Sequence, residues 1–94
     1  MGEIVTTKDT LGGEPRIEGR RVGVLHIVNR VLDGERTPEA VAAEFDLDLA
    51  DVYRALTYYY DHPGEMRGWR RRKRSAAKRA REAQPDPKEL QRRA

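Results

Sequence analysis

The 94-residue sequence predicts a mainly α-helical fold, in which short N-terminal β-strands form a hairpin before a three-helix core and a basic C-terminal helix. Apolar side chains recur at three- and four-residue steps between residues 24 and 61, the period of helices with one buried face. Residues 4–22 are instead rich in glycine and β-branched residues, which indicates short strands joined by turns. We therefore divide the chain into a helix-turn-helix domain with its hairpin, residues 1–65, and a basic helix and tail, residues 66–94.

The first 22 residues predict the hairpin. Residues 4–7 are a β-branched run that is typical of a short strand, and turn-forming glycines and a proline follow. Residues 16–22, with Gly19 at a turn, predict two further very short strands. Arg20 and Arg21 lie in this segment, where each either contacts a phosphate or is simply solvated.

Three helices are expected to form the core. The first covers residues 24–33, and Gly34 is expected to end it as a left-handed C-cap. The second covers residues 38–46, because Thr37 can cap its N-terminus and Pro38 sits where a missing N–H costs nothing.

The third helix, residues 49–61, follows so closely that the pair has the outline of a helix-turn-helix. Asp48 can cap it, and Asp51 lies in its first turn, where the helix dipole favours a negative charge. Its apolar residues are expected to form one buried stripe: Leu49, Val52, Tyr53, Leu56, Tyr59 and Tyr60. The remaining positions are expected to face outward: Ala50, Asp51, Arg54, Ala55, Thr57 and Tyr58.

A fourth helix is expected over residues 65–83, after a firm break at residues 61–64. Its apolar residues at helical steps are Met66, Trp69, Ala76, Ala80 and Ala83. Residues 1–69 hold 8 Lys and Arg against 13 Asp and Glu, net −5, whereas residues 70–94 hold 11 against 3, net +8. The basic segment therefore either attracts a polyanion or forms a solvated helix that keeps the protein soluble.

Composition argues against catalysis. The chain has no cysteine, and its two histidines, His26 and His62, lack the spacing to a second ligand that metal sites require. We expect no enzymatic activity, no metal, no cofactor and no small-molecule substrate. No apolar run approaches the ~20 residues of a membrane span, and the N-terminus lacks a signal-peptide pattern. Cytoplasm is the expected location.

Two parts of the sequence resemble domain-of-unknown-function family 433. Residues 12–22, G-G-E-P-R-I-E-G-R-R-V, are similar to the family signature G-G-x-P-x-I-x-G-T-R-I/V. Gly34, residues 37–39 and residues 47–56 resemble its motifs G-x-[ST]-P-E-E-I and P-x-L-[ST]-x-x-D-[IV]-x-A-A-L. The resemblance covers about residues 3–65, and glycine, proline and helix positions agree together.

The resemblance implies a small domain of β-hairpin and helix-turn-helix. Many similar proteins look like antitoxins of the VapB type, encoded beside a toxin with a PIN-like nuclease fold. Such antitoxins cover the toxin's cluster of metal-holding carboxylates with a C-terminal segment, and guanidinium groups suit those carboxylates. Arg20, where the family usually has Thr, and Asp46, near the usual Pro of the turn, depart from the pattern. The segment from Arg70 onward lies outside the resemblance.

The sequence leaves two main hypotheses for the function. The first is an antitoxin that binds a PIN-like toxin and represses its own operon by binding DNA, and the second is a stand-alone DNA-binding regulator without a toxin. A structural or ribosome-associated basic protein is a third class. The candidate DNA contacts are Arg54, Thr57, Tyr58, Arg20, Arg21, Arg70, Arg71, Arg72, Lys73 and Arg74. The candidate toxin contacts are Trp69, Arg70, Arg74, Lys78 and Arg81, although Trp69 could only pack the fourth helix onto the body.

The sequence also predicts a homodimer. Tyr58, Tyr59 and Tyr60 lie ~100° apart around a helix, so at least one ring must face outward. Tyrosine suits protein interfaces because it joins an apolar body to a polar tip. The edge of the strand at residues 4–7 could also pair with a second copy.

Overall fold

Two short strands, β1 (Ile4–Val5) and β2 (Arg16–Ile17), pair antiparallel at the start of the chain in the computed structural model, which describes residues 3–83. Ile4 lies opposite Ile17, and the side chain of Ile17 is 1% exposed, so the hairpin is fixed to the core. Gly19, with a φ of 77°, turns the chain after β2.

The strands are shorter than predicted, because the residues next to them in the chain form hydrogen bonds within turns. Thr7, two residues beyond the end of β1, is part of a turn: its carbonyl accepts from Thr10 N–H, and its hydroxyl accepts from Arg16. A 3₁₀ turn, η1 (Leu11–Gly13), then leads into β2. Of the two strands predicted within residues 16–22, only β2 forms.

The first predicted helix forms as α1 (Val24–Val28), which continues as one π-helical segment, η2 (Asn29–Asp33). The left-handed C-cap predicted at Gly34 is wrong, because Gly34 has a right-handed φ of −86° and Glu35 takes the left-handed φ of 52°. Gly34 N–H donates to the carbonyl of Asn29 across the wider π turn. The left-handed residue that reverses the chain is therefore Glu35, one residue later than predicted. A glycine still fits here, since a Cβ would meet the Arg30 carbonyl oxygen at 2.7 Å.

The helix-turn-helix consists of α2 (Pro38–Phe45) and α3 (Leu49–Asp61). Thr37 caps α2 as predicted, because its Oγ1 accepts from the N–H of Ala40 at 3.1 Å. Asp48 occupies the N-cap position of α3, but its side chain accepts no capping hydrogen bond. Asp46, with a φ of 54°, reverses the chain between the two helices.

The two departures from the family motifs contact each other. The Arg20 guanidinium donates to the carbonyl oxygens of Phe45 and Asp46, and the second distance is 2.7 Å. These are carbonyls at the C-terminus of α2, where unsatisfied acceptors and the helix dipole both favour a cation. Arg20 therefore joins the hairpin to the turn between α2 and α3, and its N–H donors form hydrogen bonds within the fold.

Replacing this arginine by the family's usual residue is expected to lower stability. Arg20→Thr removes two charge-assisted hydrogen bonds and should lower the free energy of unfolding by about 1–2 kcal/mol. Arg21→Thr is the matched control, because Arg21 is exposed and adjacent, and its change should stay within ~0.5 kcal/mol. Urea unfolding checks both variants; equal stability for the two would contradict this role of Arg20.

The face of α3 that enters the core differs from the predicted stripe. Val52 and Ala55 are completely buried and Asp51 is 7% exposed, whereas the side chains of Leu49, Tyr53 and Tyr60 are 39%, 49% and 63% exposed. Helices α1 and α2 pack on the side of α3 that carries small residues, where backbones can approach closely. Asp51 and Ala55 were expected to face outward and are buried. Leu56, Tyr58 and Tyr59 are half-buried against the core.

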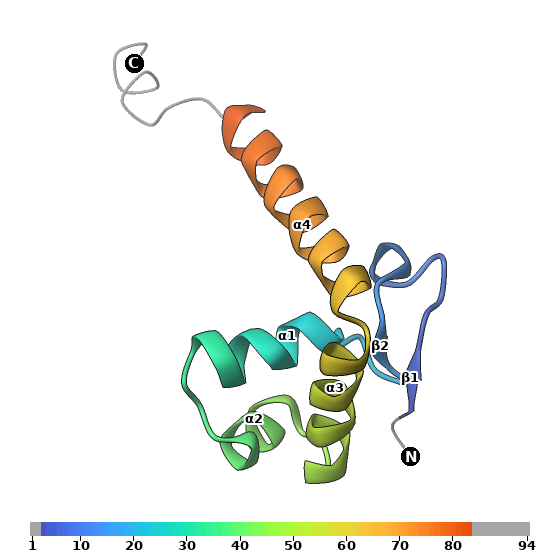
Figure 1. Cartoon of the computed structure of the whole chain (residues 1–94), viewed down its shortest axis with the longest axis vertical. Helices are drawn as coiled ribbons and strands as arrows, with labels where there is room; N and C mark the ends of the chain where they lie inside the picture. The colour runs from blue at the N-terminus through green and yellow to red at the C-terminus, as the bar shows by residue number, and fades with distance from the viewer. Residues whose placement is uncertain (1–2, 84–94) are drawn as a thin grey trace, which may run out of the picture.

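The fourth helix, α4 (Pro63–Ala83), begins two residues before the predicted start, since only His62 separates it from α3. Met66 is 1% exposed within the core, and Trp69 packs against that core. The core itself comprises Ile17, Val24, Leu25, Ile27, Val28, Val41, Ala42, Val52, Ala55 and Met66. Every described residue from Arg74 onward is exposed, and α4 leads away from the body (Figure 1).

Candidate functional site

Two basic residues in the first half of α4 form ion pairs with the rest of the domain. Arg70 lies 3.7 Å from a carboxylate oxygen of Asp33 and 5.4 Å above the ring of Tyr59. Lys73 Nζ lies 3.0 Å from Oε1 of Glu14, whose side chain is only 5% exposed. Because a buried carboxylate needs a paired cation, these two residues have a structural role that their position in a basic run did not indicate.

His26 lies close to the same ion pair. Its Nδ1 accepts a hydrogen bond from the N–H of Gly23 at 3.0 Å. Burial lowers the pKa of His26 below its usual 6.5; the positive charges of Lys73 and Arg30 also lower it, while Glu14 opposes them. Protonation of Nδ1 would also break its bond to Gly23, so the neutral imidazole is the form that fits the fold.

Stability should therefore depend on pH through His26. Because its pKa is lower in the folded state, the unfolded chain binds the proton first, and stability falls as pH drops below about 6.5. The decrease becomes complete below the folded pKa. Wild type should lose more unfolding free energy between pH 7.5 and pH 5.5 than His26→Gln, measured by urea titration. The reverse order would contradict the pKa direction.

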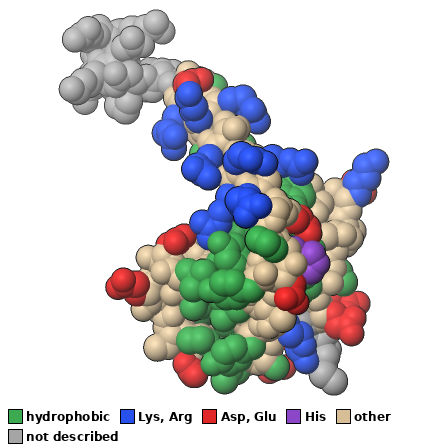
Figure 2. Space-filling model, viewed as in Figure 1, with side chains coloured by type: hydrophobic (Ala, Val, Ile, Leu, Met, Phe, Trp, Pro, Cys, Tyr) green, Lys and Arg blue, Asp and Glu red, His purple; other side chains and the backbone are tan. Residues whose placement is uncertain are grey.

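Five exposed basic side chains form one line along α4. Arg67, Arg71, Arg74, Lys78 and Arg81 follow one another at steps of four, three, four and three residues, which places them on one helix face. The line, here called the basic stripe, is about 21 Å long at 1.5 Å per residue. Within residues 3–83 none of the five forms an ion pair. Figure 2 shows basic side chains along α4 beyond the body.

The basic stripe differs from both predicted sets of contacts. It includes Lys78 and Arg81, which were candidates for a toxin, Arg71, which was a candidate for DNA, and Arg74, which was a candidate for both. Arg67 was missed, although its four-residue distance from Arg71 was a signal in the sequence. Trp69 does pack α4 onto the body. Arg72 lies on another face, with its guanidinium 4.8 Å above the ring of Trp69.

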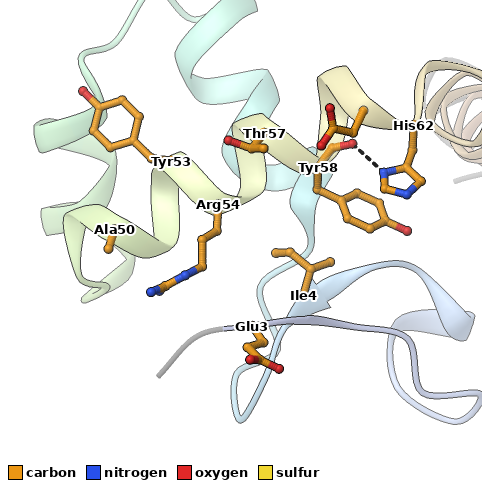
Figure 3. Close-up of a pocket in the computed structure, with 9 residues that line it drawn as sticks. Glu3, Ile4, Ala50, Tyr53, Arg54, Thr57, Tyr58 and His62 are labelled. Atoms are coloured by element: carbon orange, nitrogen blue, oxygen red, sulfur yellow. Dashed lines mark hydrogen bonds between the residues drawn. The ribbon is translucent and has the colours of Figure 1, made fainter.

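A groove runs between α3 and β1. Its volume is about 580 Å³, and it is lined by Glu3, Ile4, Ala50, Tyr53, Arg54, Thr57, Tyr58, Asp61 and His62. Arg54 and Tyr58 point toward the strand, whereas Tyr53 points away from it (Figure 3). Arg54 Nη1 binds Oδ1 of Asp51 at 2.9 Å, so part of its charge is balanced inside the domain. Glu3 and Asp61 add negative charge around it.

Tyr58 is held at the end of this groove. Its ring stacks on His62 with centroids 3.9 Å apart, and its hydroxyl donates to both carboxylate oxygens of Glu65 at 2.9 Å. Burial and this hydrogen bond raise the pKa of Tyr58 to about 12. Through this hydrogen bond the hydroxyl fixes α3 to the first turn of α4.

The predicted DNA contacts are thus spread over four places. Arg54, Thr57 and Tyr58 meet in the groove beside α3, and Arg20 is bound within the fold. Arg21 is exposed and lines a separate hollow with His26 and Phe45. The remaining candidates lie on α4. Positive charge without a balancing carboxylate therefore concentrates on α4.

Two other features are absent from the described residues. No group of three or more His, Asp or Glu side chains between residues 3 and 83 is placed to hold a metal ion. In the same range, no helix is long and apolar enough to cross a membrane.

The fold defines a class of small helix-turn-helix domains with an N-terminal hairpin. The family described as "protein of unknown function (DUF433)" matches residues 4–59, more than half of the chain, and the chain belongs to this family. The match ends before α4, so the basic stripe lies beyond it. No curated protein and no solved structure matches the chain.

Proposed function

We propose that this protein is an antitoxin that binds a PIN-like nuclease through the basic stripe of α4 and represses its own operon by binding DNA. The observation that carries the proposal is the division of charge along α4. Arg70 and Lys73 are neutralised by carboxylates of the body, whereas five further bases line an exposed face that projects from it. A helix that presents unbalanced guanidinium groups is suited to an acidic partner.

The chemistry of the basic stripe favours a compact cluster of carboxylates. Arginine presents parallel N–H donors that match both oxygens of one carboxylate, and such paired hydrogen bonds are stronger than neutral ones. Four of the five stripe residues are arginines.

The second candidate is a stand-alone DNA-binding regulator. The exposed basic side chains of α4 favour it too, because their binding to phosphates releases counterions condensed on the DNA. The helix-turn-helix favours it less, because Arg54 is paired with Asp51 and the first turn of α3 is flanked by Asp46 and Asp48. DNA affinity of this protein is therefore expected to come from α4.

We also propose a homodimer, in which the outer face of α3 contacts a second copy. Leu49, Tyr53, Leu56 and Tyr60 follow at steps of four, three and four residues, and all of them except the half-buried Leu56 are exposed. In an antiparallel pair of α3 helices related by a two-fold axis, every leucine of this stripe would meet a tyrosine. Such self-complementarity is what a two-fold interface requires. Figure 2 shows hydrophobic side chains gathered on the body.

Co-expression tests the proposed function most simply. The protein encoded by the neighbouring reading frame is induced alone and together with this chain. An antitoxin should restore growth that the neighbouring protein arrests, and the two proteins should purify together. Growth arrest that this chain does not relieve, or a neighbouring protein that never arrests growth, would favour the stand-alone regulator.

A further inference from the structure

The face of α4 next to the basic stripe carries a notch. Gly68, Arg71, Arg72, Ser75 and Arg79 line a hollow of about 360 Å³. The space beside Gly68 is open, because a Cβ at this position would meet no other atom within 4 Å. Arg72, Ser75 and Arg79 share one side of the helix at steps of three and four residues. Only Arg71 belongs to both the notch and the basic stripe.

The notch offers hydrogen-bond donors with fixed positive charge. Three of its lining side chains are guanidinium groups and a fourth is a hydroxyl, and none is a carboxylate. The Arg72 guanidinium is positioned 4.8 Å above the ring of Trp69, which itself packs against the core. Stacking of this kind orders an arginine before any ligand arrives. Between residues 3 and 83, Arg72 and Arg79 form no ion pair.

We infer that this notch binds backbone phosphates of DNA, a step that rests on the DNA-binding part of the proposed function. A ligand must supply several acceptor oxygens to three guanidinium groups, which a phosphate does. The hollow is open along the helix and has no aromatic lining of its own to hold a base, so it suits a continuing sugar–phosphate chain. Phosphate contacts of this kind position a protein on DNA without selecting its sequence.

The two basic faces of α4 then have different partners. Arg74 and Lys78 on the basic stripe are available to an acidic protein while Arg72 and Arg79 hold phosphate. The faces can therefore be separated by mutation, since each pair carries two positive charges on the same helix. A role for net charge alone would not distinguish them.

The test compares two double variants of the full chain, Arg72→Gln/Arg79→Gln and Arg74→Gln/Lys78→Gln. Affinity for a 20-base-pair duplex is measured by fluorescence anisotropy over a series of salt concentrations. The notch pair should weaken binding at least about 10-fold and flatten the salt slope by roughly 0.9 for each phosphate that the variant no longer neutralises. The stripe pair should weaken it less than about 3-fold. Circular dichroism checks that both variants keep their helices.

A second readout uses Trp69, the only tryptophan. Phosphate that engages Arg72 should change Trp69 emission when duplex is added to wild type, and the notch pair should lose this response. Equal weakening by both pairs would overturn the inference. So would a response to inorganic phosphate with duplex affinity unchanged in the notch pair, which would indicate a site for free anions. Neither result bears on growth rescue, so failure of the antitoxin proposal remains distinguishable.

Discussion

Reversing two charges of the basic stripe is expected to abolish capture of an acidic nuclease. Arg74→Glu/Lys78→Glu replaces two cations with carboxylates that would face the partner's own carboxylates, and affinity should fall at least about 100-fold. Growth rescue by co-expression should disappear together with co-purification. Both residues are exposed and form no ion pair in the described part of the chain, so the fold should be unaffected.

The matched control is Arg72→Glu/Arg79→Glu, which makes the same charge change on the notch face of the same helix. This variant should still rescue growth while its DNA affinity falls. Arg70 and Lys73 are unsuitable for such a test, because they pair with Asp33 and Glu14 and their replacement would loosen α4 from the body. If neither double variant rescued growth, the separation of the two faces would be wrong.

Placing a charge on the outer face of α3 is expected to convert the protein from dimer to monomer. Tyr53→Glu would bury two carboxylates near the two-fold axis of the proposed pair, and the dimer dissociation constant should rise more than about 100-fold, because an unpaired buried charge costs several kcal/mol. Tyr53 is 49% exposed in the single chain, so the monomer should remain folded. Analytical ultracentrifugation measures the change.

Thr57→Glu serves as the control for the interface. Thr57 is exposed one turn beyond Tyr53, at the edge of the stripe of Leu49, Tyr53, Leu56 and Tyr60 rather than within it, and lies beside Arg54 in the groove. It should stay dimeric at concentrations where Tyr53→Glu is monomeric. A wild-type chain that sediments only as a monomer at micromolar concentration would contradict the proposed interface.

The sequence was sufficient for the order and approximate bounds of the helices. Turn chemistry at Thr37 and Pro38 fixes the start of α2, and helix α3 has its predicted bounds. The face of α3 that was predicted to be buried is wrong in part, because this helix carries apolar residues on most of its circumference. The spacing of apolar residues then fits either of two helix faces equally well. The large tyrosines favoured the face that is exposed in the structure. Close packing of α1 and α2 buries Val52, as predicted, together with Asp51 and Ala55, which were expected to face outward.

The division of α4 into paired and free bases could not be predicted from the sequence alone. It depends on Glu14, which is buried beneath α4 although 59 residues separate it from Lys73. Asp33 likewise meets Arg70 only in the folded chain. The contact of Arg20 with the carbonyl of Asp46 is another long-range pair, although both positions had already stood out against the family motifs. The four-three spacing of the basic stripe, by contrast, was present in the sequence.

Direct binding to the neighbouring protein tests whether the basic stripe occupies a carboxylate cluster. Calorimetry would titrate the full chain into that protein, and into a variant with its clustered carboxylates replaced by amides. We predict tight binding to the first, weakened by salt and by Arg74→Glu/Lys78→Glu, and at least about 100-fold weaker binding to the second. Equal affinity for both forms of the partner would contradict binding of the basic stripe to the carboxylate cluster.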